Sequence, residues 1–164
     1  MRVPNRKPGE FTKIIPDPYI TLDKFNKLKA ERQKLKTLLP QAVAEVQRLS
    51  ETGDYSENAA YQMSKSRLRN FNQRLLDLND QLKMSIIIKP KHQNKVQLGS
   101  RVKVNIDGQL KTYLILGSSE IDLKNNTISH NSPMGFALMS KKVGDTVSLK
   151  LTDQEIKMEI IKID

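Results

Sequence analysis

Two stretches of this chain place residues at alternating spacings of three and four, and the two patterns fit each other in one register. The first stretch contains Phe25, Leu28, Arg32, Leu35, Leu39, Ala42, Val46 and Leu49, and the second contains Tyr61, Ser64, Leu68, Phe71, Leu75, Leu78 and Leu82. This spacing is typical of the contact stripe of a coiled-coil helix, here called the seam. If the chain reverses near residue 55, facing residues have numbers that sum to 110, so one register satisfies both stretches. The sequence therefore predicts an antiparallel helical hairpin.

The first helix carries signals at its start and in its interior. Thr21 is a candidate N-cap, since a threonine hydroxyl can accept a hydrogen bond from the first helical turn. Pro40 predicts a kink near residues 36–40, because a proline inside a helix removes one hydrogen bond and crowds the preceding turn. Arg32 interrupts the apolar seam opposite Leu78, and we expect its stem to lie along the seam with its guanidinium in water. Each arm has about 30 residues, so the tip is expected roughly 45 Å from the base.

The second half of the chain changes to the two-residue alternation of strands. Valine and isoleucine alternate with polar residues over Arg101–Ile106, and Asp107-Gly108 is a strong signal for a two-residue hairpin turn. Leu110–Leu116 then returns as the partner strand. The remaining predicted elements are a turn at Asn125-Asn126, a strand at Thr127–Ser129, a short helix that begins at Ser132-Pro133 and ends before Gly144, and a strand pair at Val147–Leu151 and Glu155–Ile163 around Asp153-Gln154.

These patterns predict an α+β fold in which an antiparallel α-helical coiled-coil hairpin precedes a small β-sheet domain with one short helix. Residues 1–18 contain four prolines and no periodicity, so we assign them to a flexible basic arm. The hairpin covers residues 19–84 with its tip at residues 53–57, a linker covers residues 85–99, and the sheet domain covers residues 100–164.

The positive charge of the chain is concentrated in its helical half. The net charge of +10 divides into 19 Lys and Arg against 10 Asp and Glu in residues 1–95, and 9 against 8 in residues 96–164. This surplus suggests a polyanionic partner such as nucleic acid, although a solvated helix surface gives the same pattern. The chain has no cysteine, which excludes disulfides and thiolate metal sites, and no apolar run near 18 residues, so no membrane span is expected. These features fit a cytoplasmic protein.

Two carboxylates, Asp54 and Glu57, stand three residues apart at the predicted tip, next to Gly53. One interpretation is a capping box, in which Asp54 caps the second helix and Glu57 bonds back to the N-cap N–H group. The other is that both carboxylates project from the tip as metal ligands. Two carboxylates are too few to hold Mg²⁺ tightly, so such a metal would have to be held partly by another molecule.

The tip sequence Gly53-Asp54-x-x-Glu57-Asn58-Ala59-x-Tyr61 resembles that of the bacterial Gre transcript-cleavage factors, the GreA/GreB family. Pro40 lies at the spacing before the tip where that family also has proline. The other half of the chain is similar to the family in Glu120-x-Asp122-x-Lys124, Ile128-Ser129, Ser132-Pro133, Leu138, Lys141 and Gly144-Asp145. The resemblance runs in order over residues 19–164. Ser140 and Ile121 depart from it, since family members often have Gly and a small residue there, and so does the arm before Tyr19.

The resemblance implies a fold and a mechanism. The hairpin would precede an FKBP-like domain that docks on the rim of the secondary channel of RNA polymerase, with Ser132, Pro133 and Lys141 in the docking surface. The hairpin would reach the active site, where Asp54 and Glu57 help to hold a second Mg²⁺ and orient a water, and backtracked RNA is cut there by the polymerase. The chain is therefore expected to be an accessory factor and not an enzyme. It is expected to act as a monomer on the elongation complex and the nascent RNA 3′ end, to share Mg²⁺ with the polymerase and to bind no cofactor by itself.

The second helix contains four basic residues, Lys65, Arg67, Arg69 and Arg74, with no acidic residue between positions 64 and 74 and none of the four on the seam. In the family context they predict contact with RNA or polymerase. The alternative is a solvated helix face.

Three other functions fit parts of the pattern. Some relatives with this architecture inhibit polymerase, typically with an altered tip, so the intact pair of Asp54 and Glu57 favours stimulation. A peptidyl-prolyl isomerase is a second alternative, but Tyr113 and Phe136 are the only aromatic residues in the sheet half, too few to line a proline pocket. A coiled-coil chaperone or a general nucleic-acid binder is the third, and it predicts that the tip acids are dispensable.

Overall fold

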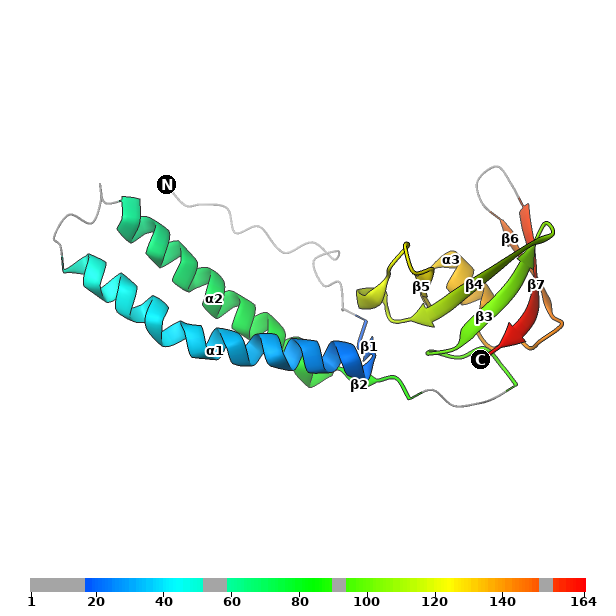
Figure 1. Ribbon diagram of the computed structural model, residues 1–164, viewed down its shortest axis with the longest axis horizontal. Coiled ribbons are helices and arrows are strands. Elements are labelled where there is room, and N and C mark those ends of the chain that lie inside the picture. The colour runs from blue at the N-terminus through cyan, green and yellow to red at the C-terminus, as the bar shows by residue number, and fades with distance from the viewer. Residues whose placement is uncertain (1–16, 52–58, 90–93, 151–154) are drawn as a thin grey trace, which may run out of the picture.

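The computed structural model describes residues 17–51, 59–89, 94–150 and 155–164, which form a helical hairpin and a sheet domain (Figure 1). The hairpin consists of α1 (Leu22–Ser50) and α2 (Ala59–Met84), with the short strands β1 (Tyr19–Ile20) and β2 (Ile86–Ile87) at its base. The sheet domain contains β3 (Arg101–Ile106), β4 (Gln109–Leu116), the 3₁₀ helix η2 (Ser118–Glu120), β5 (Thr127–Ser129), α3 (Pro133–Leu138), β6 (Thr146–Lys150) and β7 (Glu155–Ile163). This is the predicted α+β architecture.

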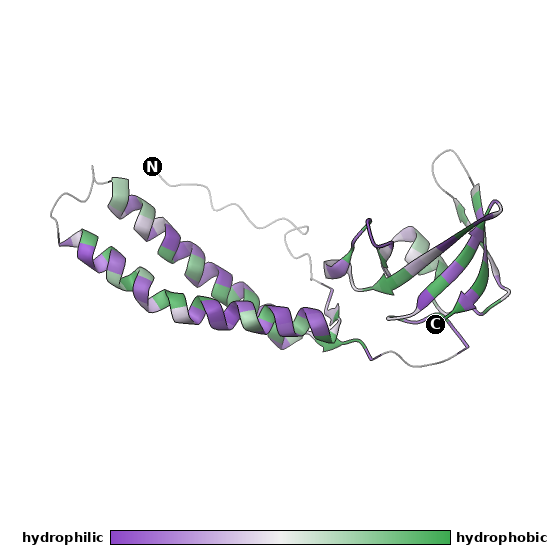
Figure 2. Ribbon diagram, in the orientation of Figure 1, coloured by the Kyte–Doolittle hydropathy of each residue, from purple (hydrophilic) through white to green (hydrophobic). Residues whose placement is uncertain are grey.

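The seam of the hairpin is buried, as its spacing predicts. All the predicted seam residues are buried or half-buried, and Leu78 is fully inaccessible. At the base, Leu28 and Leu78 form one cluster with Ile20, and Leu82, the predicted partner of Leu28, packs against this cluster. Outside the seam both helices are largely hydrophilic (Figure 2), as expected for a pair of helices whose other faces meet water. No helix in the described parts of the chain is long and apolar enough to cross a membrane.

The start of α1 follows the predicted cap, and its interior contains the predicted proline. The Thr21 hydroxyl accepts a hydrogen bond from the Lys24 N–H group at 3.2 Å. Pro40 lies inside α1, which is otherwise one continuous helix of 29 residues. Figure 1 shows α1 changing direction part-way along its length, which is the kink expected where a proline removes a hydrogen bond.

Arg32 differs from its expected placement. Its Nη1 donates a hydrogen bond to Asn79 Oδ1 at 3.4 Å, which ties α1 to α2 beside the seam. Its Nε is buried and has no hydrogen-bond partner among the described residues. The expectation that this guanidinium lies in water is therefore wrong: it is drawn partly into the seam, where its length lets it reach the neighbouring helix.

The sheet domain is built on five strands in the order β5-β4-β3-β7-β6. β4 and β5 are parallel, and the other neighbours are antiparallel. The hairpin between β3 and β4 turns at Asp107 and Gly108, as predicted, and both residues have positive φ angles, of 50° and 84°. Two consecutive positive φ angles define the type I′ turn, whose twist matches that of the flanking strands. The Ser132-Pro133 helix start and the final strand pair are also present.

The core of the sheet domain lies between α3 and one face of the sheet. Val102 and Val104 of β3, Leu138 of α3 and Ile160 of β7 are fully inaccessible. Val96, in the predicted linker, is equally buried, and its backbone pairs with Lys141 O and Ser140 N at 2.8 and 2.9 Å. The sheet domain thus recruits part of the linker into its core.

The base of the hairpin contains a pair of two-residue strands that the sequence did not predict. β1 and β2 are parallel, with Tyr19 opposite Ile86 and Ile20 opposite Ile87. The Ile86 N–H donates to the Pro18 carbonyl at 2.8 Å, so Pro18, at the end of the predicted arm, belongs to this base. The preceding arm residues 1–16 lie outside the described part of the chain.

Candidate functional site: a two-helix arm and the domain at its base

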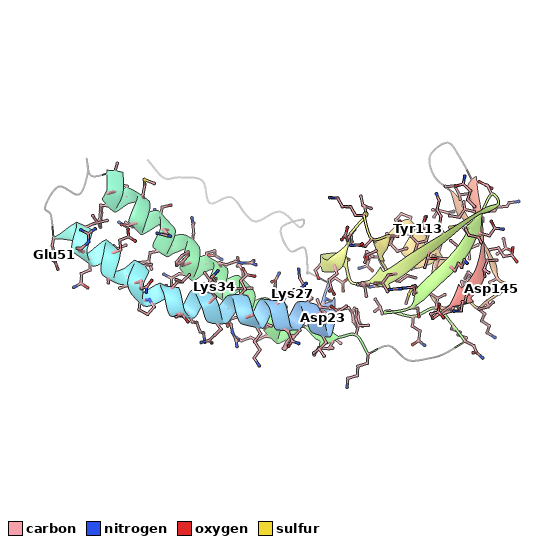
Figure 3. The ribbon with its side chains drawn as sticks, in the orientation of Figure 1. Asp23, Lys27, Lys34, Glu51, Tyr113 and Asp145 are labelled. Carbon is pink, nitrogen blue, oxygen red and sulfur yellow. The ribbon has the colours of Figure 1, made fainter. Side chains whose placement is uncertain are left out.

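α1 ends and α2 begins at the end of the arm far from the sheet domain (Figure 1), and the predicted tip lies between them in the sequence. Asp54 and Glu57 lie outside the described residues, so the capping and metal-ligand interpretations both stay predictions. The structure does define where the arm ends: α1 stops at Ser50, with Glu51 beyond it (Figure 3), and α2 begins at Ala59. With 26 residues, α2 is about 39 Å long, so its first residue lies about that far from the base of the hairpin.

A cleft of about 420 Å³ separates the two helices just below the tip, lined by Glu45, Arg48, Leu49, Ala60, Met63, Ser64 and Arg67. The cleft exists partly because Ser64 is small and occupies a seam position that a leucine would fill. The Ser64 hydroxyl turns back to its own helix and bonds to the Tyr61 carbonyl at 2.8 Å. The cleft therefore presents basic, acidic and apolar groups together, near the end of α1 and the start of α2.

Helix geometry divides the four predicted basic residues of α2 into two pairs. All four are exposed. With the seam at heptad positions a and d, Arg67 and Arg74 fall at g on one flank of the arm, whereas Lys65 at e and Arg69 at b fall on the other.

The flank of Arg67 and Arg74 carries acidic partners on α1. Arg74 donates two hydrogen bonds to Glu31, at 2.8 and 3.0 Å, and Arg67 lies 3.8 Å from Glu45. The hydrogen bonds of Arg74 lower the pKa of the Glu31 carboxyl, and those to Glu31 raise the pKa of Arg74. Because both side chains of this pair are more than 40% exposed, it contributes only about 0.2–1 kcal/mol to stability. Arg67 and Arg74 therefore fasten the two helices together.

The opposite flank has no acidic residue at any e or b position in the described parts of the two helices. It presents five exposed basic residues, Lys29 and Lys36 from α1 and Lys65, Arg69 and Lys83 from α2, which we call the acid-free flank. In the described helices, Lys83 follows Asp80 by three positions, but the other four residues have no acidic residue three or four positions away on their own helix. This flank is therefore the part of the arm best suited to a polyanion. The sequence already held the signal for this difference between the two flanks: it can be seen by assigning heptad positions and comparing the charges at g with those at e and b.

Ser132, which the sequence predicts in a docking surface, holds the start of α3 in place. Its hydroxyl accepts a hydrogen bond from the Gly135 N–H at 3.1 Å and donates one to the Ser129 carbonyl at 2.6 Å, which fixes the start of α3 on β5. Gly135 is needed beside it, because a Cβ there would lie 2.0 Å from the Ser129 carbonyl oxygen.

Pro133 and Lys141, the other two predicted docking residues, are exposed at the start of α3 and just after its end. Phe136, which the sequence did not assign to a site, is 77% exposed. It lies three residues after Pro133, so the two share one face of α3. Exposed aromatic residues are enriched at protein interfaces, and the three-residue spacing within the predicted helix could have identified this one.

Both halves of the chain match families of known proteins. Residues 18–87 match the family described as "Transcription elongation factor, N-terminal", and residues 90–164 match "Transcription elongation factor, GreA/GreB, C-term". The chain belongs to the Gre family of transcription elongation factors. The match of both halves agrees with the order of hairpin and sheet domain described above.

Two GreA relatives support this assignment over most of the chain. The chain is 35% identical to transcription elongation factor GreA of Nitratiruptor sp. over 143 residues, which cover 85% of this chain and 88% of the relative. It is 35% identical to GreA of Thermosipho africanus over 148 residues, which cover 88% and 95%. Among solved structures, GreA factor homolog 1 of Thermus thermophilus is 23% identical with a TM-score of 0.40, covering 85% of this chain and 94% of that one.

Proposed function

We propose that this Gre factor binds RNA polymerase through the α3 face of its sheet domain and brings Asp54 and Glu57 to the polymerase active site. There it stimulates the polymerase to cut backtracked RNA and so rescues arrested elongation complexes. The observation that carries the proposal is the combination of membership in the family with the Asp54–Glu57 pair, at the end of an arm about 39 Å long.

The donor chemistry of the chain fits a shared Mg²⁺. In the described residues no group of three or more His, Cys, Asp or Glu could hold a metal ion. Asp54 and Glu57 add two carboxylates, which are the hard oxygen ligands that Mg²⁺ prefers but too few to bind it alone. Bound Mg²⁺ would supply charge stabilisation and water activation for phosphodiester hydrolysis. The part of the chain is to add two carboxylates at the right place, which makes it an accessory factor rather than the nuclease.

The acid-free flank is where we place the extruded RNA. Backtracking extrudes the RNA 3′ end, a single strand with one negative charge per phosphate. Lys65 and Arg69 on the tip half of α2, followed by Lys29 and Lys36 toward the base, present unneutralised charge to such a strand. Arg67 and Arg74 belong less to this contact, since both face carboxylates of α1. We place the factor with the polymerase in the bacterial cytoplasm, acting as a monomer.

The direct test is to add the purified chain to a stalled, backtracked elongation complex whose RNA is labelled at the 3′ end. The expected result is release of short 3′ fragments at a rate far above the polymerase alone. A chain that binds polymerase, releases no fragments and slows elongation would instead be an inhibitory regulator, and the proposal would be wrong.

A further inference from the structure

The base of the hairpin and the sheet domain meet at a small joint formed by residues 17–21 on one side and residues 117–120 with His130 on the other. Two carboxylates cross it in opposite directions. Asp17 reaches from the hairpin side to Ser118 of the sheet domain, 101 positions away in the sequence. Glu120 reaches from the sheet domain to Thr21 of the hairpin, 99 positions away.

Asp17 binds the start of η2. Its Oδ2 accepts hydrogen bonds from the Ser118 N–H at 2.7 Å and the Ser118 hydroxyl at 2.9 Å. The same oxygen lies 3.4 Å from His130 Nδ1, and the side chain of Asp17 is only 5% exposed. Its other oxygen accepts from the Tyr19 N–H at 3.1 Å, so the carboxylate is fully engaged.

Glu120 binds the start of α1. Its two carboxylate oxygens accept hydrogen bonds from the Thr21 N–H at 2.7 Å and the Thr21 hydroxyl at 2.6 Å. Thr21 is the N-cap of α1, so the contact holds the residue from which the whole helix extends. Two short bonds to one residue fix an orientation as well as a distance.

Gly117 lets the two backbones approach. A Cβ on this residue would lie 1.8 Å from the Tyr19 carbonyl oxygen, far closer than the 3.4 Å of an ordinary van der Waals contact. The φ and ψ angles of Gly117 are −71° and 161°, which any residue adopts, so glycine is needed here for space and not for its backbone freedom.

Beside this joint the two parts of the molecule stand apart. A cleft of about 580 Å³ is lined by Lys24, Leu28, Arg74 and Met84 of the hairpin and by Ser118, Ser119 and Asn131 of the sheet domain, among others. The joint therefore borders an open cleft, and within the joint the rings of Tyr19 and His130 also meet edge to face, with centroids 5.7 Å apart.

We propose that Asp17 and Glu120 are positioning residues that form a reciprocal clamp and fix the direction of the hairpin relative to the sheet domain. The inference rests on the proposed function, because the direction of the arm matters only if its tip must reach a fixed place. A rotation of about 10° at the joint would move the end of an arm about 39 Å long by roughly 7 Å. A carboxylate must lie about 2.0–2.1 Å from Mg²⁺ to be its ligand, so the clamp decides whether the tip acids arrive.

The clamp is tested by measuring the direction of the arm directly. The chain has no cysteine, so Glu51→Cys and Lys111→Cys can place two spin labels at exposed positions, one near the tip and one on the sheet. The protein without clamp substitutions is expected to give one narrow distance distribution. Asp17→Asn combined with Glu120→Gln should broaden it, and Gly117→Ala, which wedges the joint apart, should broaden or shift it. The matched controls Asp23→Asn and Glu159→Gln neutralise exposed carboxylates of the two domains and should leave it unchanged.

The same variants, without labels, are then compared in RNA cleavage. The clamp variants should lower the cleavage rate at saturating factor at least tenfold, because small misplacements of reacting groups are costly, while the half-saturating concentration changes less than about threefold. Unchanged helicity by circular dichroism would exclude unfolding. An undisturbed distance distribution, or full cleavage despite a broadened one, would overturn the clamp. If the unsubstituted chain stimulates no cleavage, the proposed function fails, whereas the distance measurement still decides whether the clamp exists.

Discussion

At the tip, the proposed chemistry depends on two side chains. Asp54→Asn and Glu57→Gln should each nearly abolish stimulated cleavage, because an amide is a poor ligand for Mg²⁺ and carries no charge. Binding to polymerase should stay close to that of the unsubstituted chain, since the proposed docking face on α3 belongs to the sheet domain, at the other end of the arm. The measurements are release of 3′ RNA fragments and competition for polymerase.

Alanine variants at the same positions separate the two interpretations of the tip when they are compared with the amide variants by circular dichroism. If Asp54 and Glu57 serve chiefly as a capping box, Asp54→Ala should lower helicity and reduce stability by about 0.5–2 kcal/mol, whereas Asp54→Asn and Glu57→Gln, which keep capping side chains, should leave both nearly unchanged. Cleavage at the normal rate by a folded double variant would remove these residues from the mechanism.

Asp17 predicts a pH dependence of stability. Burial, the largest single influence, raises the pKa of its carboxyl, but hydrogen bonds from Ser118 and Tyr19 together with His130 outweigh it, so the pKa lies below its ordinary value of 3.8. A carboxyl with a lowered pKa in the folded state stabilises the protein above pH 3.8 and loses this contribution as the pH falls through the folded-state pKa. Asp17→Asn should therefore lower the melting temperature at pH 7, and the gap to the unsubstituted chain should narrow below about pH 4. A gap that is constant with pH would show that the carboxylate charge is not involved.

The contacts of Asp17, Glu120 and Arg32, which the sequence did not reveal, share one property: their partners are distant in the chain. Asp17 and Glu120 each bind across about a hundred positions, and neither stands in a periodic pattern or a turn motif. Arg32 was noticed as an exception in the seam, but its contact with Asn79 depends on how far its side chain extends across the helix pair. Such contacts are decided by packing rather than by local preference.

At the scale of elements, the acid-free flank predicts that removing positive charge from this side of the arm weakens the response to RNA more than removing it from another side. Lys29→Gln with Lys36→Gln should weaken the response to long extruded RNA and make it less sensitive to salt, because each phosphate contact releases a counterion. For a single strand the logarithmic salt slope should fall by about 0.7 per charge removed. The measurement is the half-saturating concentration for cleavage over a range of salt.

The chain offers a matched control for this experiment. Lys27 and Lys34 are also exposed lysines seven residues apart on α1, but they lie at c positions on the other side of the arm. Substituting this pair with glutamine removes the same charge and should leave the salt slope nearly unchanged. Equal effects of the two pairs would show that only total charge matters and that the flank has no special role.

The α3 face makes a separate prediction about docking. Phe136→Ala should weaken binding to polymerase by more than about 1 kcal/mol if this ring lies in the interface. It should change thermal stability very little, because the side chain is 77% exposed in the free protein. Leu110→Ala, at a 58% exposed position on β4, is the control and should bind normally. Competition between labelled and unlabelled factor for polymerase measures both.

The elements that the sequence predicted are those whose cause is local. The hairpin follows from a seven-residue repeat, the β3–β4 turn from Asp107-Gly108, and the start of α3 from Ser132-Pro133. β1 and β2 escaped prediction because two residues are too few to show alternation. Their pairing depends on the hairpin bringing Tyr19 beside Ile86. The tip acids were located in the sequence, yet their conformation lies outside the described residues.

In the whole molecule, the position of the tip acids would depend on three features together. The α3 face would fix the sheet domain on the polymerase, the clamp of Asp17 and Glu120 would fix the direction of the hairpin, and the seam would keep the arm straight enough to transmit that direction. An error at any of these places moves the same two carboxylates. The length of the arm is the remaining variable, and it can be changed without touching the docking face or the clamp.

Arm length is tested by removing one heptad from each helix. Residues 38–44 face residues 66–72 in the predicted register, so deleting both blocks leaves the remaining seam positions in phase. This choice keeps the base cluster of Ile20, Leu28 and Leu78 and the bond between Arg74 and Glu31. The shortened chain should still fold as a helical pair, which circular dichroism can verify, and should still compete for polymerase.

The shortened arm should nevertheless give no stimulation of cleavage. Seven residues at about 1.5 Å each reduce the reach by roughly 10 Å, which side-chain movement cannot restore to the distance of a Mg²⁺ ligand. The deletion also removes Pro40, Arg67 and Arg69, so full-length Pro40→Ala and the double variant Arg67→Gln, Arg69→Gln are the controls. Both should retain a large part of the cleavage activity, because they keep the tip acids at their distance. If the shortened chain cleaved as well as these controls, delivery of the acids by an arm of fixed length would be the wrong mechanism.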